Sequence, residues 1–167
     1  MPNVLVTMPF DEGLLDRLRA VSPDLAVTRG DPATADYSRA DVLYAGNPPR
    51  DLARAPRLTW AQLHMAGVNA LHDHPIFAAR QIALTTSSGV HAAAIAEYAV
   101  TMLLALAKRV PRMVEWQGRG GWPPDERRWP LFVPTEVRGA TLGVIGYGSI
   151  GRELAREIAA YPAPSAQ

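Results

Sequence analysis

A glycine-rich turn near the carboxyl end constrains the fold more than any other feature of this sequence. The segment TLGVIGYGSIGREL, Thr141 to Leu154, has a β-branched apolar run, three closely spaced glycines and the first turns of a helix. In such a turn the first glycine permits a tight bend, the second admits a pyrophosphate close to the backbone, and the third lets helix and strand pack closely. The pattern predicts the first strand, at Thr141–Ile145, and the following turn and helix of a dinucleotide-binding domain.

The predicted cofactor-binding residues are consecutive: Gly146, Tyr147, Gly148, Ser149, Ile150 and Gly151. A helix predicted from about Ser149 to Ala160 would direct free N–H groups and its positive dipole end toward the phosphates. The alternative is that these glycines only shape a tight turn. The full motif also needs an acidic residue about 20 residues further on. The last acidic residue is Glu157, inside the predicted helix, and we expect the prolines at 162 and 164 to prevent a second strand there.

The first 88 residues alternate short apolar runs with turn and helix signals. Five runs predict strands, at Val4–Met8, Leu25–Thr28, Asp41–Ala45, Leu58–His64 and Ile82–Thr86. Helical patterns lie between some of them, beginning at Asp11 and near Asp51. Strands that alternate with short helices are typical of a mostly parallel sheet with helices on both faces. The sequence therefore predicts a small, doubly wound α/β domain over residues 1–88.

Two further segments follow that domain. His91 to Arg109 predicts a helix that is apolar except for a stripe of Glu97, Thr101 and Lys108. A helix that is apolar nearly all round is buried on several sides, so we expect it to pack between two domains or two subunits. The next segment, Trp116–Pro134, combines three tryptophans with four prolines. We expect it to be an extended arm without regular structure that lies on another surface.

Composition excludes several classes of function. The chain has 167 residues, a formal net charge of +1, no block of lysine and arginine, and no cysteine. This gives no support for nucleic acid or an anionic membrane as a partner, and it excludes disulfides, thiolate metal sites and a cysteine nucleophile. The N-terminus lacks the basic segment of a signal peptide, and the longest apolar run, Ala92 to Ala107, is short and interrupted. We therefore expect a cytoplasmic protein.

Three segments in order resemble the NAD-dependent D-isomer-specific 2-hydroxyacid dehydrogenases, which include phosphoglycerate dehydrogenase-like and hydroxypyruvate/glyoxylate reductase-like members. They are QLHMAGVNAL at Gln62–Leu71, TTSSGVHAAAIAEYAVTMLLALAKR at Thr85–Arg109 and RGATLGVIGYGSIGREL at Arg138–Leu154. The resemblance implies a flavodoxin-like doubly wound parallel sheet as the substrate domain at 1–88. It implies an interdomain helix with a proline- and tryptophan-rich arm at 89–137, and the truncated start of an NAD-binding Rossmann domain at 138–167.

The same resemblance implies an oxidoreductase that transfers a hydride between NAD(H) and a small 2-oxo or 2-hydroxy acid. It places the substrate carboxylate on the backbone N–H groups of the loop Ala66, Gly67 and Val68, for which a plain strand-to-helix turn is the alternative. It also implies a homodimer through residues 91–135, and the choice between NAD and NADP stays open.

In the resembling family the catalytic arginine, glutamate and histidine come later than the residues present here. We therefore assign no catalytic residue to this chain and expect an N-terminal fragment that is inactive alone. The alternative is a non-catalytic remnant that acts as a binding or dimerisation module.

The remaining chemistry-bearing residues have simpler interpretations. His64 ends a predicted strand and either lines a cleft or is a structural histidine, and the second is favoured. The segment His72-Asp73-His74 looks like a metal site, but alternate residues on a helix face opposite ways, and we expect no metal. Ser87 and Ser88, with His91 nearby, lack the glycine elbow of a nucleophile, and we expect them to cap the next helix.

Overall fold

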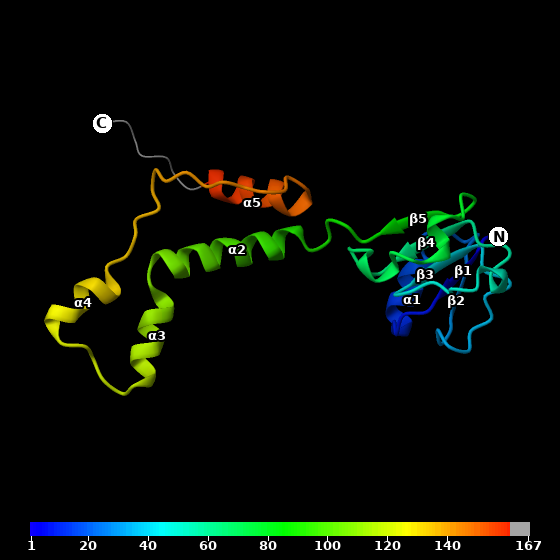
Figure 1. Cartoon of the computed structure of the whole chain (residues 1–167). Helices are drawn as coiled ribbons and strands as arrows, with labels where there is room; N and C mark the ends of the chain where they lie inside the picture. The colour runs from blue at the N-terminus through cyan, green and yellow to red at the C-terminus, as the bar shows by residue number, and fades with distance from the viewer. Residues whose placement is uncertain (161–167) are drawn as a thin grey trace. The chain divides into compact units, whose positions relative to one another are not determined.

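The computed structural model of the protein describes residues 1–160. The chain divides into two compact units, Met1–Ser88 and the residues from Gly89 onward (Figure 1). The expected absence of a second strand after the last helix concerns residues 161–167 and lies outside the described residues.

The first unit is built on a five-stranded parallel sheet, as predicted. Its strands are β1 (Asn3–Val6), β2 (Ala26–Arg29), β3 (Val42–Ala45), β4 (Trp60–Leu63) and β5 (Ala83–Thr86). They lie in the order β2-β1-β3-β4-β5, and every neighbouring pair is parallel. This is the flavodoxin-like order, in which the direction of strand addition reverses between β1 and β3. The carboxyl ends of these two strands therefore mark the place where such sheets bind ligands.

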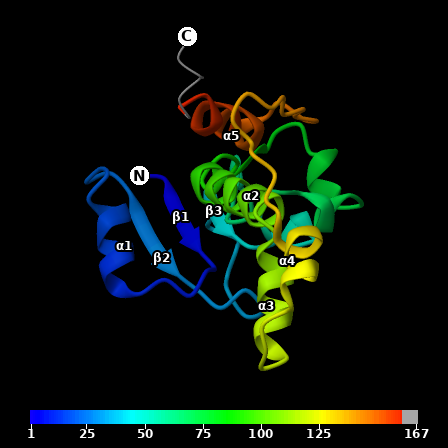
Figure 2. The ribbon, with the colours of Figure 1, turned by 90° about the vertical axis from the view of Figure 1, so that its left-hand side faces the viewer.

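One face of the sheet is covered by α1 (Glu12–Arg19), which lies beside β2 (Figure 2). The helix starts at Asp11, whose carboxylate accepts a backbone N–H of the first turn at 2.9 Å. Its Leu15 is buried together with Val6 and Val27 of the two strands beneath it. The alternation of side chains along a strand sends Leu5, the neighbour of Val6, to the opposite face.

The opposite face holds the larger core, which is covered by short 3₁₀ helices and loops instead of α-helices. The 3₁₀ helices are η1 (Leu52–Arg54), η2 (Asn69–Leu71) and η3 (Pro75–Phe77). Buried residues shared by the sheet and these connections include Leu43, Leu58, Ala61, Ile76 and Ile82. Both faces of the sheet are thus covered, and the α/β fold class is confirmed.

The second unit is helical over the described residues. It contains α2 (Ala92–Ala107), α3 (Val110–Gly118), α4 (Asp125–Phe132) and α5 (Ser149–Ala159), and α5 packs along α2 (Figure 1). The predicted long helix is present as α2, and its expected burial between two domains or two subunits stays a prediction, because the described residues of this chain cover one side of it. Only Ala96 of α2 is buried, while Tyr98 is 64% and Leu106 66% exposed, because α5 covers one side of the helix.

The expected irregular arm over Trp116–Pro134 is also wrong, because its prolines fall mostly at helix boundaries. Pro123 and Pro124 precede α4, and Pro130 lies inside it, two residues before the helix ends. Proline removes a backbone donor, so it is best tolerated where that donor has no helical partner. Acidic residues in the first turn favour α4, and Trp122 packs on Phe132 with ring centroids 5.3 Å apart.

The predicted strand at Thr141–Ile145 is not formed. The segment leads into α5, but no strand is assigned among residues 89–160. A β-strand is stabilised by hydrogen bonds to a neighbouring strand, and none of the described residues of this unit provides one. Ile145, which a sheet would bury, is fully exposed. In the described part of the chain, no helix has both the length and the hydropathy needed to cross a bilayer.

Candidate functional site

The glycine turn before α5 has a geometry that only glycine can adopt at two of its positions. Gly146 has φ +93°, a backbone conformation that is strained for any residue with a side chain. A Cβ on Gly151 would lie 2.2 Å from the carbonyl oxygen of Gly146 and 3.3 Å from Val144. The first glycine thus makes the bend, and the third lets the helix approach the turn.

The middle glycine has a different surrounding. Gly148 precedes the first turn of α5, and a Cβ built on it would meet no heavy atom within 4 Å. Behind it, Ser149, Ile150 and Gly151 are the first three residues of the helix, whose N–H groups have no acceptor within the helix. None of them donates to another described residue. The turn therefore combines open space with free donors at the positive end of a helix dipole, which is the arrangement that binds phosphates.

Arg152 adds positive charge at the same end of α5. Its Nη1 donates to the carbonyl oxygen of Tyr147 at 3.3 Å, so the guanidinium folds back over the turn. The nearby Glu153 is engaged by Arg156 one turn later in the helix. The geometry of the predicted residues 146–151 is therefore suited to the pyrophosphate of a dinucleotide.

The second predicted site is the loop at Ala66–Val68, in the first unit. It follows β4 directly and continues into η2, where the N–H of Leu71 donates to the carbonyl oxygen of Val68 at 2.8 Å. The N–H groups of Gly67 and Val68 donate to no described residue, and a Cβ on Gly67 would meet nothing within 4 Å. Successive free N–H groups in a loop form a concavity for anions.

An aromatic group lies beside this loop that the sequence did not lead us to expect. His64 follows β4, and its Nδ1 lies 2.9 Å from the hydroxyl of Tyr44 in β3. Phe10, which follows β1, packs on both rings. One feature of the sequence could have indicated this group, because all three residues lie at or just after the carboxyl ends of predicted strands.

The other histidines in the first unit have local partners. His74 is buried, its Nδ1 accepts the N–H of Ile76 at 3.2 Å, and its Nε2 lies 3.2 Å from the carbonyl oxygen of Pro48. His72 pairs with Asp73 at 2.7 Å on the surface. Within residues 1–160 no three acidic or histidine side chains are grouped as metal ligands.

The serines expected to cap α2 do not do so. The residue that precedes α2 is His91, which makes no side-chain capping bond. Ser87 donates its hydroxyl to the carbonyl oxygen of Leu63 at 3.0 Å and accepts a hydrogen bond from Gln62 at 3.4 Å. Ser87 therefore ties the end of β5 to β4.

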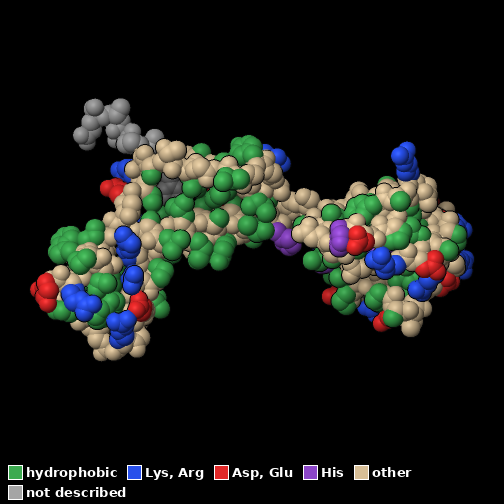
Figure 3. All heavy atoms as spheres, viewed as in Figure 1, with side chains coloured by type: hydrophobic (Ala, Val, Ile, Leu, Met, Phe, Trp, Pro, Cys, Tyr) green, Lys and Arg blue, Asp and Glu red, His purple; other side chains and the backbone are tan. Residues whose placement is uncertain are grey.

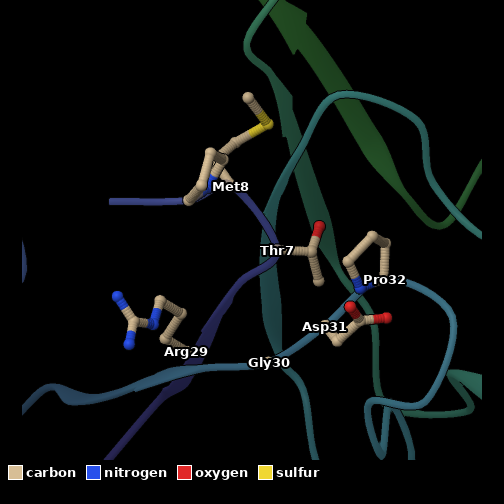
Figure 4. Close-up of a pocket in the computed structure, with 7 residues that line it drawn as sticks. Thr7, Met8, Arg29, Gly30, Asp31 and Pro32 are labelled. Carbon is tan, nitrogen blue, oxygen red and sulfur yellow. The ribbon is translucent and has the colours of Figure 1, made fainter. Parts of the chain in front are cut away.

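An open depression of about 460 Å³ lies at the carboxyl ends of β1 and β2. Figure 4 shows Thr7 directed toward Asp31 and Pro32, whereas Arg29 points the opposite way. Asp31 accepts the N–H of Ala33 at 2.8 Å, and Arg29 donates to the carbonyl oxygen of Phe10. The charged groups of the depression thus support the loops of the chain itself, and we assign no ligand to it.

Comparison with known proteins gives a consistent set of similarities. Residues 100–164 match the family described as D-isomer specific 2-hydroxyacid dehydrogenase, NAD binding domain. A glyoxylate reductase from Thermococcus litoralis is 34% identical over 107 residues, which are 63% of this chain and 32% of that protein. Glyoxylate/hydroxypyruvate reductase B from Escherichia coli is 27% identical over 93% of this chain and 49% of its own length.

A solved structure extends the similarity to three dimensions. The NADPH-dependent glyoxylate/hydroxypyruvate reductase from Sinorhizobium meliloti, in complex with NADP and malonate, matches with a TM-score of 0.60 and 27% identity. The match covers 97% of this chain and 51% of that one. The chain therefore spans between about a third and a half of the length of these relatives.

Proposed function

Because the chain belongs to the D-isomer specific 2-hydroxyacid dehydrogenase family and covers part of its members' length, we propose that it is part of an oxidoreductase. The reaction would transfer a hydride between a nicotinamide cofactor and the C2 carbon of a small 2-oxo or D-2-hydroxy acid. The observation that carries this proposal is the glycine turn, whose first and third glycines are sterically required and whose second leaves the space that a pyrophosphate needs.

The residues of this chain would bind and orient the cofactor. When bound, NAD(H) supplies the hydride or accepts it. The backbone at Gly148 would approach the pyrophosphate, the N–H groups of Ser149 and Ile150 would donate to its oxygens, and Arg152 would add positive charge. We take NAD as the cofactor from the description of the matching family, and competition with NADP in the titration below distinguishes the two.

The first unit would hold the substrate by its carboxylate. The free N–H groups of Gly67 and Val68 lie at the carboxyl edge of a parallel sheet, where such folds bind ligands. Small 2-oxo acids are the substrates named for the glyoxylate and hydroxypyruvate reductases to which this chain is similar. No residue of this chain is assigned a proton-transfer role.

A titration of the chain with NADH, followed by nicotinamide fluorescence, tests the cofactor site. We expect saturable binding that Gly148→Ala weakens by about tenfold or more, because a methyl group would occupy the space of the pyrophosphate. Gly118→Ala is the matched control, since that glycine ends α3 and also has open space at its Cβ. Equal affinities for the two variants would contradict the assignment.

A second candidate function is a non-catalytic binding or dimerisation module. The observation that favours it is the apolar surface of the helical unit, which Figure 3 shows along α2. Exposed large apolar residues of this unit include Tyr98 and Leu106 on α2, Val114 on α3, Trp129 on α4, and Trp122 between α3 and α4. Large apolar patches on a surface favour association. We propose that residues 91–135 form the contact of a homodimer.

Light scattering of the purified chain tests this contact. We expect a dimer that Leu106→Asp dissociates, whereas Val21→Asp, an equally exposed site in the first unit, leaves it intact. A wild-type chain that is monomeric and soluble would refute the dimer.

The same preparation addresses activity. We expect no oxidation of NADH with glyoxylate or hydroxypyruvate by this chain alone, and measurable turnover would overturn that expectation. The cytoplasmic location expected from the sequence stays a prediction, which fractionation of cells would check.

A further inference from the structure

Three aromatic side chains from three different strand ends converge at the carboxyl edge of the sheet. Phe10 follows β1, Tyr44 lies in β3, and His64 follows β4. The ring centroid of His64 lies 5.9 Å from that of Tyr44 and 6.3 Å from that of Phe10, both in edge-on geometry. Tyr44 and Phe10 are themselves 5.2 Å apart. The imidazole is therefore held against two rings that belong to the packed face of the sheet.

A hydrogen bond fixes the rotation of this imidazole. The hydroxyl of Tyr44 lies 2.9 Å from Nδ1 of His64. We assign the hydroxyl as the donor and Nδ1 as the acceptor, because the phenol O–H is more acidic than the N–H of a neutral imidazole. In that tautomer Nε2 carries the proton, and Nε2 has no acceptor among residues 1–160. His64 is exposed and its Nε2 has no partner among residues 1–160, so the ring has one N–H donor available to a ligand.

This arrangement differs from that of the other histidines of the unit. His74 is buried and both of its ring nitrogens have partners, as expected for a structural histidine. His72 pairs with the neighbouring Asp73. His64 is exposed, and only its inward nitrogen is engaged. The structural role favoured from the sequence therefore does not account for its free donor.

The position of His64 on the loop indicates which kind of ligand it would bind. It lies three residues before Gly67, on the loop whose N–H groups at Gly67 and Val68 are free. Its own backbone N–H donates to the carbonyl oxygen of Ala45 at 2.8 Å, which anchors the start of the loop to β3. A carboxylate offers two oxygens with about four acceptor sites. Two backbone donors leave acceptor sites that a third donor on the same loop can fill.

We propose that His64 is a substrate-contacting residue that donates its Nε2–H to the carboxylate of a small 2-oxo acid, and that Tyr44 is the positioning residue that orients it. The inference rests on the proposed function of the loop Ala66–Val68, called the carboxylate loop below, and adds a side chain to it. The contact binds the anion and transfers no proton.

Nuclear magnetic resonance of the ¹⁵N-labelled chain tests this inference, with oxamate as an unreactive analogue of a 2-oxo acid. Without ligand, the ring spectrum of His64 should show a protonated Nε2 and an unprotonated Nδ1. Oxamate should shift the Nε2 resonance of His64 and the amides of Gly67 and Val68 with one common Kd. Acetamide, which has no carboxylate, serves as the ligand control and should shift none of these resonances.

Three variants separate the roles. His64→Phe keeps a ring against Phe10 and removes the donor, so it should weaken oxamate binding by about fivefold to tenfold. Tyr44→Phe keeps the packing and removes the hydroxyl, so the ring of His64 should become a mixture of tautomers and binding should weaken by a smaller factor. His72→Gln is the matched control and should bind like the wild type, because His72 faces Asp73.

The outcomes separate this inference from the proposed function. Shifts at Gly67 and Val68 with an unchanged Kd in His64→Phe would refute the role of His64 and leave the carboxylate loop standing. A His64 ring protonated at Nδ1 in the free chain would refute the positioning by Tyr44. The absence of any shift at Gly67 and Val68 at millimolar oxamate would refute the carboxylate loop, and the inference with it.

Discussion

The first unit, which contains the sheet, and the second unit, which is helical, differ in how they bury apolar side chains and pair backbone groups. In the first, every strand pairs with a neighbour inside the same 88 residues, and central side chains such as Leu43 and Leu63 are buried. In the second, Ala96, Pro123 and Gly151 are the buried residues among those described, and large apolar side chains are exposed. The first unit has the features of an independent core, whereas the second has helices whose apolar faces are still available for contacts.

The glycine turn shows what this difference means for function. It keeps the geometry of a phosphate-binding turn although the strand predicted before it is not formed and residues 89–160 provide no strand to pair with it. Turn geometry depends on steric limits within a few residues, while a strand depends on hydrogen bonds to a distant part of the chain. The turn geometry expected for a cofactor site is therefore present although residues 89–160 form no sheet.

The largest expected contrast between the units concerns core substitutions. Leu43→Ala, at the centre of the sheet, should lower the free energy of unfolding by about 2–5 kcal/mol, because it leaves a cavity. At protein concentrations too low for the proposed dimer, Leu106→Ala on the exposed side of α2 should change it by less than about 0.5 kcal/mol. Urea denaturation followed by circular dichroism measures both. A large effect of Leu106→Ala would mean that α2 is covered in solution, as in the proposed dimer.

A smaller effect is expected at the glycine turn. Gly151→Ala should destabilise the turn and α5 by about 1–3 kcal/mol, because the added methyl group would overlap the carbonyl oxygen of Gly146. Gly148→Ala should leave stability nearly unchanged, because its Cβ meets no atom. Hydrogen exchange of the α5 amides measures the effect locally. Equal protection in both variants would show that the turn does not hold the helix in solution.

The smallest effect concerns the amino edge of the sheet and its dependence on pH. The backbone N–H of Asn3, at 2.8 Å, and the guanidinium of Arg57 bind the carboxylate of Asp41 and lower its pKa below the ordinary 3.8. A lowered pKa means that this stabilisation is complete above about pH 4 and is lost as the pH falls through the folded value. Asp41→Asn should therefore reduce stability near neutral pH and flatten its loss in acid.

Denaturation curves between neutral pH and acid measure the Asp41 effect. Asp24→Asn, at an exposed carboxylate, serves as the control. A steeper acid loss in Asp41→Asn than in the wild type would contradict the assignment.

Much of the fold was accessible from the sequence because the relevant signals are local. Apolar runs of the right length located all five strands within about two residues, and Gly146, Gly148 and Gly151 located the turn before α5. Helices α3 and α4 were missed because we counted the prolines of this segment and did not consider where they would fall in a helix. Pro124 precedes α4 and Pro130 lies near its end, where the helix tolerates them. Tyr44 and Phe10 were missed as neighbours of His64 because their place at the carboxyl ends of predicted strands does not show which strands are adjacent, and the order β1-β3-β4 brings them together.

The sequence by itself determined the alternation of strands and helices in the first unit and the glycines that the turn requires, since each depends on steric and hydrogen-bonding limits over a few residues. Only the tertiary structure decided which strands are neighbours, which apolar side chains are exposed and which nitrogen of His64 is engaged. Those properties depend on contacts between residues far apart in the chain, such as the 20 positions that separate Tyr44 from His64.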